Sequence, residues 1–175
     1  MTVIRPATAA DMDGVSEIFA HYVEHSVFTF EEAAPPVSAW RERLDDLTAR
    51  ELPFLVAEFE GVVAGYAYAS PWRPKPAYRH TVENSIYLAP GHSGRGLGGA
   101  LLRALIATCT ELGKRQMIAV IADSGTNASH TLHQRHGFKE TGRLSAVGYK
   151  HGRWLDTVLM QRALGEARTE PTTAT

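Results

Sequence analysis

The feature that most constrains the fold of this chain is a glycine-dense turn between a predicted strand and a predicted helix. Its glycines are Gly94, Gly96, Gly98 and Gly99. Glycine lets the backbone approach a ligand without obstruction by a Cβ atom. The helix N-terminus beside the turn presents free N–H groups and a partial positive charge. The segment therefore predicts a phosphate site, to which the Arg95 side chain can add a charge.

Two common phosphate-binding motifs fit this segment poorly. A P-loop ends in Gly-Lys followed by Ser or Thr, whereas residues 98–100 are Gly-Gly-Ala. A dinucleotide-binding fold places its glycines after the first strand, with an acidic residue about 20 positions further on. Here the glycines follow the fourth predicted strand, so physical reasoning leads to a pyrophosphate-bearing ligand. A flexible turn that binds nothing is the alternative.

Hydrophobic periodicity predicts a mixed α/β domain around one sheet. We expect strands at Thr2–Pro6, Phe54–Phe59, Val62–Ala69, Thr81–Leu88, Gln116–Ile121, Phe138–Gly148 and Trp154–Gln161. We expect helices over Met12–Val23, from Ser38, over Ala100–Leu112 and over Asn127–His136. The domain should span residues 1–164, and the polar tail at 165–175 should be disordered.

Three local patterns refine this prediction. Thr8 and Asp11 have the spacing of a helix capping box, with Asp in place of the usual Glu. The near-continuous apolar run Gln116–Ile121 is typical of a strand that is covered on both faces. The segment Pro71–Pro76 holds three prolines, which remove amide donors and restrict φ, so it should not form regular structure.

Composition disfavours several classes of protein. Hydrophobic residues make up 44% of the 175 residues, and 18 basic against 19 acidic side chains leave a net charge of −1. That balance disfavours a nucleic-acid-binding module, which usually has a basic excess. The single cysteine, Cys109, should lie in the core, and it excludes an internal disulfide. No apolar stretch is long enough to span a membrane, and Met1–Pro6 lacks the pattern of a signal peptide, so we expect a cytoplasmic protein.

Four segments together carry a family resemblance. They are the glycine turn with the preceding Ile86–Leu88, and the segments Tyr78–Tyr87, Leu132–Phe138 and Val147–Asp156. In this combination the chain resembles the GCN5-related N-acetyltransferases (GNAT), and within them the branch of phosphinothricin and methionine sulfoximine or sulfone acetyltransferases. The likeness spans about residues 3–162. It implies an α/β fold whose mixed, mostly antiparallel central sheet is flanked by helices, with acetyl-CoA at the splay after the fourth strand.

The resemblance also implies which residues hold acetyl-CoA. The backbone of Ile86, Tyr87 and Leu88 would pair with the pantetheine arm like an additional strand. The amides from Gly94 to Gly99 would hold the pyrophosphate, with Arg95, Gly96, Leu97 and Gly98 between them.

Two positions depart from the family pattern. Ser93 stands where the family usually has Gln or Arg, so one side-chain contact to the cofactor is missing. Thr126 occupies the place of a cofactor-binding Asn near the start of the late helix, and the adjacent Asn127 could serve instead.

Acetyl transfer to an amine needs a neutral amine, a donor for the developing oxyanion and a proton for the leaving thiolate. Glu83 resembles the family's base, and the Leu88 amide would polarise the thioester carbonyl. His133 stands where this branch has a histidine acid, and an imidazole with a pKa of about 6.5 can move protons near neutral pH. In the alternative interpretation, Glu83 is a solvated strand carboxylate and His133 is a packed helix residue.

Three histidines at helical spacing, His130, His133 and His136, raise the possibility of a metal site. This spacing brings neighbouring side chains together, but no helical carboxylate joins them. We therefore expect no metal, and the resemblance implies acetyl-CoA as the cosubstrate.

The loop before the Glu83 strand suggests a small zwitterionic acceptor. Arg73 and Arg79 could bind a carboxylate or phosphinate bidentately, with Tyr78 in the same loop. Phe28 and Phe30 could form an apolar wall for a methylated sulfur or phosphorus group. The arginines could instead be solvated loop charges, and the phenylalanines packing residues.

The resemblance implies direct transfer in a ternary complex, with no acyl-enzyme, and a homodimer. Two alternatives stay open within the same fold. The acceptor could be a peptide N-terminus or a polyamine, or the protein could be a catalytically silent CoA-binding sensor. The sequence does not separate phosphinothricin from methionine sulfoximine or methionine sulfone as the acceptor.

Overall fold

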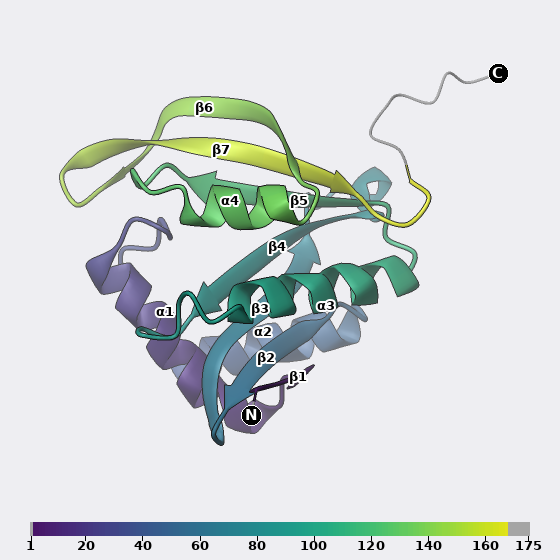
Figure 1. Ribbon diagram of the computed structural model, residues 1–175, viewed down its shortest axis with the longest axis horizontal. Coiled ribbons are helices and arrows are strands. Elements are labelled where there is room, and N and C mark those ends of the chain that lie inside the picture. The colour runs from purple at the N-terminus through teal and green to yellow at the C-terminus, as the bar shows by residue number, and fades with distance from the viewer. Residues whose placement is uncertain (1, 168–175) are drawn as a thin grey trace.

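The computed structural model describes residues 2–167, whose seven strands form one sheet with helices on both faces (Figure 1). The strands are β1 (Thr2–Pro6), β2 (Phe54–Phe59), β3 (Val62–Pro71), β4 (Thr81–Leu88), β5 (Gln116–Ala122), β6 (Lys139–Lys150) and β7 (Arg153–Ala163). The helices are α1 (Met12–His25), α2 (Val37–Ala49), α3 (Leu97–Glu111) and α4 (Ala128–Arg135), with short 3₁₀ turns η1 (Ala9–Asp11) and η2 (Pro76–Tyr78). This element order confirms the predicted mixed α/β architecture.

The strands lie in the spatial order β1-β2-β3-β4-β5-β7-β6. Every neighbouring pair is antiparallel except β4 and β5, which confirms the expected mostly antiparallel sheet. Successive side chains of a strand point to opposite faces, so each face receives its own helices. On one face Trp40 of α2 packs against Tyr66 of β3, while on the other Leu101 of α3 lies next to Gly65.

The parallel pair β4 and β5 opens towards its carboxyl end (Figure 1). Thr81–Asn84 pairs with Gln116–Ala119, and beyond those residues the two strands are not paired, although β4 continues to Leu88 and β5 to Ala122. The remaining length of β4 is therefore bonded on its β3 side and open on its β5 side. This is the splay after the fourth strand that the family resemblance implied.

Several predicted boundaries were wrong. Helix α3 begins at Leu97, three residues earlier than expected. Gly98 and Gly99 therefore lie in its first turn, where backbone amides have no acceptor within the helix. Strand β3 extends to Pro71, which is paired with Val82 at the end of the ladder. Pro76 begins a 3₁₀ turn, so the proline segment is irregular only between these ends. The bounds of β1, β2 and β4 are as predicted, and the remaining ends differ from prediction by at most two residues.

The core contains Cys109 as predicted, and burial raises the pKa of its thiol to about 12. The capping box is also confirmed: the Asp11 carboxylate accepts hydrogen bonds from the Thr8 amide and hydroxyl. Among residues 2–167, no helix is both long and apolar enough to cross a membrane. The predicted disordered tail lies outside the described residues except for 165–167, which form a turn.

Candidate active site

A cavity of about 1010 Å³ occupies the opening between β4 and β5. It is lined by the α1–α2 connection, β4, the glycine turn, β5 and α4, together with Tyr22 of α1 and Thr157 of β7. Residues 119–122 of β5 belong to this wall. The expectation that β5 is covered on both faces was therefore wrong at its carboxyl end, where its apolar side chains face a cavity and Val120 is exposed.

Backbone conformation shapes the glycine turn for close approach by a ligand. Gly94 and Gly96 have φ values of 77° and 78°, a region that side-chain-bearing residues rarely adopt. No atom lies within 4 Å of where a Cβ would sit on either residue, and both line the cavity. Gly96 is also the N-cap of the 15-residue helix α3, whose first amides have no acceptor within the helix. The turn therefore offers unobstructed N–H groups at a positive helix end.

The backbone of β4 presents donors to the open side of the sheet. The ladder with β3 includes bonds from the Ala89 amide to the Ala64 carbonyl and from the Trp72 amide to the Thr81 carbonyl. Both lie in the register that places Leu88 opposite Gly65. Because alternate residues of a strand direct their N–H groups to opposite sides, those of Ile86 and Leu88 point away from β3. They face the opening between β4 and β5.

The carbonyl of Leu88 has a partner that the sequence did not indicate. The Tyr22 hydroxyl of α1 donates a hydrogen bond of 2.7 Å to it. Burial raises the pKa of Tyr22, so its proton stays in place to hold this contact. Tyr22 therefore fixes the end of β4 while the Leu88 amide remains directed at the opening.

Glu83 lies on β4 in the wall of the cavity, where it is partly buried. Burial raises the pKa of its carboxyl above the ordinary value, and the charge of Arg73 opposes that rise. A carboxylate with a raised pKa is a better proton acceptor at neutral pH than a solvated one. The environment of Glu83 thus suits a general base.

His133 also lies in the cavity wall, but both of its ring nitrogens have protein partners. Nδ1 lies 2.8 Å from the Ser129 carbonyl, and Nε2 lies 2.9 Å from Asn84 Oδ1. The Asn84 amide nitrogen donates in turn to the Ile118 carbonyl at 3.2 Å. The network joins α4 to β4 and β5 at the point where the two strands part. Burial lowers the pKa of His133, while the Ser129 contact opposes that change.

The structure brings most of the predicted site residues to this one cavity. Those that line it are Phe28, Phe30, Glu83, Ile86, Tyr87, Leu88, Gly94, Gly96, Gly98, Gly99, Asn127 and His133. Ser93 lines it as well, whereas Thr126 does not. The neighbouring Asn127 therefore occupies the position from which a side chain can reach the cavity.

Two residues of the predicted cofactor site point elsewhere. The Arg95 guanidinium lies over the Phe59 ring, 5.7 Å from its centroid, and Arg95 does not line the cavity. The Leu97 side chain is buried in the core, so its contribution to a ligand is confined to its backbone amide. In the structure Arg95 packs on an aromatic ring, and its charge contact to a phosphate stays a prediction.

The three predicted acceptor-binding residues of the proline-rich loop also lie outside the cavity lining. The Arg73 guanidinium lies 4.9 Å from the Trp72 ring centroid, yet it is close enough to Glu83 to act on its pKa. Arg79 donates a hydrogen bond to the Pro76 carbonyl, and Tyr78 is exposed. The two guanidiniums therefore have different local partners and do not act together as a pair within this chain.

Sequence reasoning missed several lining residues. They are Tyr22, Thr29, Asn84, Ser85, Ala119, Val120, Ile121, Ala122, Ala128, Ser129, Thr131, Leu132, Arg135, His136 and Thr157. A signal existed for Asn84, because a polar side chain at an inward position of a strand must find a buried partner. Tyr22 gave no such signal, because in the sequence it is one member of the apolar stripe of α1.

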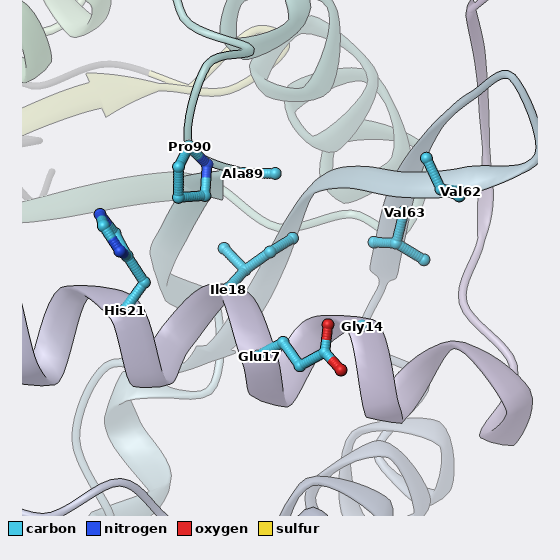
Figure 2. Close-up of a pocket in the computed structure, with 8 residues that line it drawn as sticks. All are labelled: Gly14, Glu17, Ile18, His21, Val62, Val63, Ala89 and Pro90. Atoms are coloured by element: carbon cyan, nitrogen blue, oxygen red, sulfur yellow. The ribbon is translucent and has the colours of Figure 1, made fainter.

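A smaller groove of about 380 Å³ lies along α1 and holds none of the predicted site residues. Figure 2 shows Ile18 and His21 directed from α1 towards Ala89 and Pro90, with Val62 and Val63 on β3. Glu17 and His21 are its ionisable side chains. The groove differs from the larger cavity because it lacks both the open strand edge and the glycine turn.

The histidines of α4 and of its C-cap have separate partners. His130 Nε2 lies 3.2 Å from Glu140, and His136 Nδ1 lies 2.8 Å from the Leu132 carbonyl. Within residues 2–167, no group of three His, Cys, Asp or Glu side chains is arranged to hold a metal ion. Each histidine is thus accounted for by a contact within the protein.

Comparison with known proteins connects this geometry to an enzyme family. Residues 4–159 match the acetyltransferase (GNAT) domain family. The phosphinothricin N-acetyltransferase of Alcaligenes faecalis is 45% identical over 95% of this chain and 84% of its own length. The L-methionine sulfoximine/L-methionine sulfone acetyltransferase of Salmonella typhimurium is 41% identical over 93% of this chain and 95% of its own length.

A solved structure agrees in fold. The GNAT superfamily phosphinothricin acetyltransferase from Sinorhizobium meliloti, in complex with acetyl-CoA, matches with a TM-score of 0.92 and 46% sequence identity. The match covers 98% of this chain and 94% of that one. The opening of the sheet between β4 and β5, and the glycine turn beside it, thus belong to a fold that is known to bind acetyl-CoA.

Proposed function

Because the chain belongs to the GNAT acetyltransferase family, we propose that it acetylates the α-amino group of a small amino-acid analogue with acetyl-CoA. The acceptor class is that named for its relatives: phosphinothricin, methionine sulfoximine or methionine sulfone. The observation that carries the proposal is the placement of Glu83, which lies half-buried in the cavity between the open edge of β4 and helix α4.

The residues present fit acetyl-CoA. The turn from Gly94 to Gly99 would hold the pyrophosphate through backbone amides, since the space beside Gly94 and Gly96 is free of side chains. The N–H groups of Ile86 and Leu88 face the opening: that of Ile86 would pair with the pantetheine arm, and that of Leu88 stays available for the thioester carbonyl. Asn127, at the N-cap of α4, supplies an amide side chain from the opposite wall.

Bound acetyl-CoA supplies an acetyl group activated as a thioester. The Glu83 carboxylate accepts a proton from the acceptor ammonium, directly or through water, so that a neutral amine is available to attack. The Leu88 amide donates to the carbonyl oxygen on which negative charge develops, and Tyr22 holds that strand end in place. His133 is proposed as the proton source for the leaving thiolate. In that role Nε2 would leave Asn84 Oδ1 and donate its proton to the thiolate.

Three further parts of the proposal concern the whole protein. Residues 1–164 act as a single acetyltransferase domain in the cytoplasm, the compartment that a single buried thiol favours. The active form is a homodimer, supported by exposed Leu144, Val147, Tyr149 and Trp154 on the β6–β7 hairpin. Arg73 and Arg79, which lie outside the cavity lining, would bind the acceptor carboxylate from the loop that precedes β4 after leaving their contacts with Trp72 and Pro76.

The test is release of CoA from acetyl-CoA with a panel of acceptors. We expect saturable turnover with methionine sulfone, methionine sulfoximine and phosphinothricin, and none with spermidine or an N-terminal peptide. Glu83→Gln should lower kcat by about 100-fold or more, whereas Glu111→Gln, an exposed glutamate of α3, should leave it unchanged. His133→Ala tests the acid role, and an unaltered kcat would make His133 a packing residue.

Other outcomes identify the alternatives. Turnover with spermidine or peptide alone would assign a different amine acceptor. No CoA release with any acceptor of the panel, with acetyl-CoA still bound in calorimetry, would identify a CoA-binding sensor.

A further inference from the structure

One wall of the active-site cavity is attached to a strand that is remote in sequence. Phe28, Thr29 and Phe30 line the cavity from the connection between α1 and α2. The Lys150 ammonium of β6 donates a hydrogen bond of 2.9 Å to the Thr29 carbonyl, across a sequence separation of 121 residues. Lys150 is 4% exposed, and burial lowers its pKa, while the charges of Glu31 and Glu32 oppose that change. A buried ammonium that contacts a loop carbonyl is a strong restraint on that loop.

Thr29 is held from a second direction by β4. Its side chain lies close enough to the Tyr87 phenol to lower that group's pKa against the effect of burial, and its hydroxyl accepts a bond from the Glu31 amide at 3.2 Å. Tyr87 is on the strand whose backbone faces the cavity opening, next to Leu88. The segment that carries Phe28 and Phe30 is therefore fixed between β4 and β6.

Gly148 of β6 sets how closely Phe30 can approach the hairpin. A Cβ atom at position 148 would lie 2.4 to 2.9 Å from three carbon atoms of the Phe30 ring. Gly148 does not have a positive φ, so its backbone conformation does not call for glycine. The reason for glycine at this position is the space that the Phe30 ring occupies.

A bulge in β6 brings residue 148 to the Phe30 ring. The register with β7 shifts between Leu144 and Gly148, where Ala146 has a φ of 51°. The Asp156 carboxylate of β7 accepts a hydrogen bond of 2.8 Å from the Ala146 amide and thereby stabilises the bulge. A bulge redirects the side chains that follow it.

We propose that Gly148 and Lys150 are specificity-determining positions for the acceptor, because together they set where Phe28 and Phe30 stand in the cavity. The proposal rests on the proposed function and adds that the β6–β7 hairpin decides the size of acceptor side chain that the cavity accepts. Neither residue lines the cavity, so both act through Thr29 and Phe30.

The first experiment substitutes Gly148→Ala, with Gly142→Ala as the matched control. Gly142 lies on the same strand, but the nearest atom to its Cβ position is 4.0 Å away, an ordinary contact. The methyl group at 148 displaces the Phe30 ring, so KM for methionine sulfone should rise about tenfold or more, and KM for a smaller acceptor should rise less. The Kd for acetyl-CoA in calorimetry should stay within about twofold. Equal changes for all acceptors, or no change, would overturn the proposal.

The second experiment substitutes Lys150→Met, with the exposed Lys139→Met of the same strand as control. Amide hydrogen exchange is measured on the protein without ligands, and exchange at residues 27–31 should accelerate at least about tenfold. Unaltered exchange would show that the lysine does not hold the segment. This readout needs no turnover, so it is separate from the acceptor panel: wild-type silence on that panel contradicts the proposed function, whereas normal exchange in Lys150→Met contradicts the hairpin restraint.

Discussion

At the scale of the residue, two opposing influences act on Glu83. Partial burial disfavours the charged carboxylate and raises its pKa, whereas the positive charge of Arg73 stabilises the carboxylate and limits that rise. A base must be ionised to accept a proton, so with Glu83 in its proposed role activity would be lost as the pH falls through its raised pKa. Arg73 would then widen the pH range of activity on the acidic side, even though it does not line the cavity.

Arg73→Ala should move the acidic limb of the kcat/KM profile to higher pH, because it removes the charge that lowers the pKa of Glu83. The profile is measured with saturating acetyl-CoA between pH 5 and pH 9. Arg79→Ala is the matched control, since Arg79 bonds the Pro76 carbonyl and is not among the groups that act on Glu83. The electrostatic explanation fails if the limb stays in place in Arg73→Ala, or if both variants move it equally.

At the scale of the element, one arginine joins the first two strands to the start of α1. Arg5 of β1 donates to both carboxylate oxygens of Asp11 at 2.8 and 2.7 Å, and its Nε donates to Glu58 of β2 at 2.9 Å. These bonds to Arg5 lower the pKa of Asp11 to about 2. Asp11 is almost fully buried, so solvent screens the pair little.

Asp11→Asn should lower the free energy of unfolding by about 2 kcal/mol at pH 7, since each unit of pKa shift corresponds to about 1.4 kcal/mol. The folded-state pKa is depressed below the ordinary 3.8, so the stabilisation is complete above that value and is lost as the pH falls towards 2. Urea unfolding at a series of pH values measures the difference. Asp46→Asn is the control, because the exposed pair Asp46–Arg50 contributes little. A constant difference from pH 7 to pH 2 would contradict the assignment.

At the scale of the whole molecule, the β6–β7 hairpin faces in two directions. One side holds the cavity wall through Gly148 and Lys150, and the other exposes apolar side chains. Trp154 is 69% exposed, and its ring lies 5.0 Å from that of the exposed Tyr149. Contiguous exposed aromatic surface is typical of a protein interface. A homodimer through this surface would place the interface next to the element that supports the acceptor site.

Trp154→Glu should convert the proposed dimer to a monomer, because it places a charge in the apolar centre of the interface. Sedimentation velocity over a range of concentrations measures the change. Val62→Glu is the control: Val62 is similarly exposed, at 59%, but lies on the β2–β3 hairpin. Dimers that persist in Trp154→Glu would move the interface to another surface, and a monomeric wild-type protein would contradict the homodimer.

Local patterns in the sequence were sufficient to predict the order of elements, the bounds of β4, the capping box and the glycine turn. The family resemblance led to Glu83 and His133, which the structure brings to the same cavity. These features depend on residues within one or two turns of each other, where alternation, helical periodicity and glycine content act directly on the backbone. The family resemblance rested on the same short segments.

Tertiary structure alone decided which side chains reach the cavity. Tyr22 bonds Leu88 across 66 positions and Lys150 bonds Thr29 across 121, while Arg95 turns to the Phe59 ring and Arg79 to its own loop. Side-chain direction in a loop is chosen by the partners that packing provides, and those partners come from distant strands. The sequence by itself therefore determined the elements and the chemistry available, and the packing of the sheet and helices determined where that chemistry is placed.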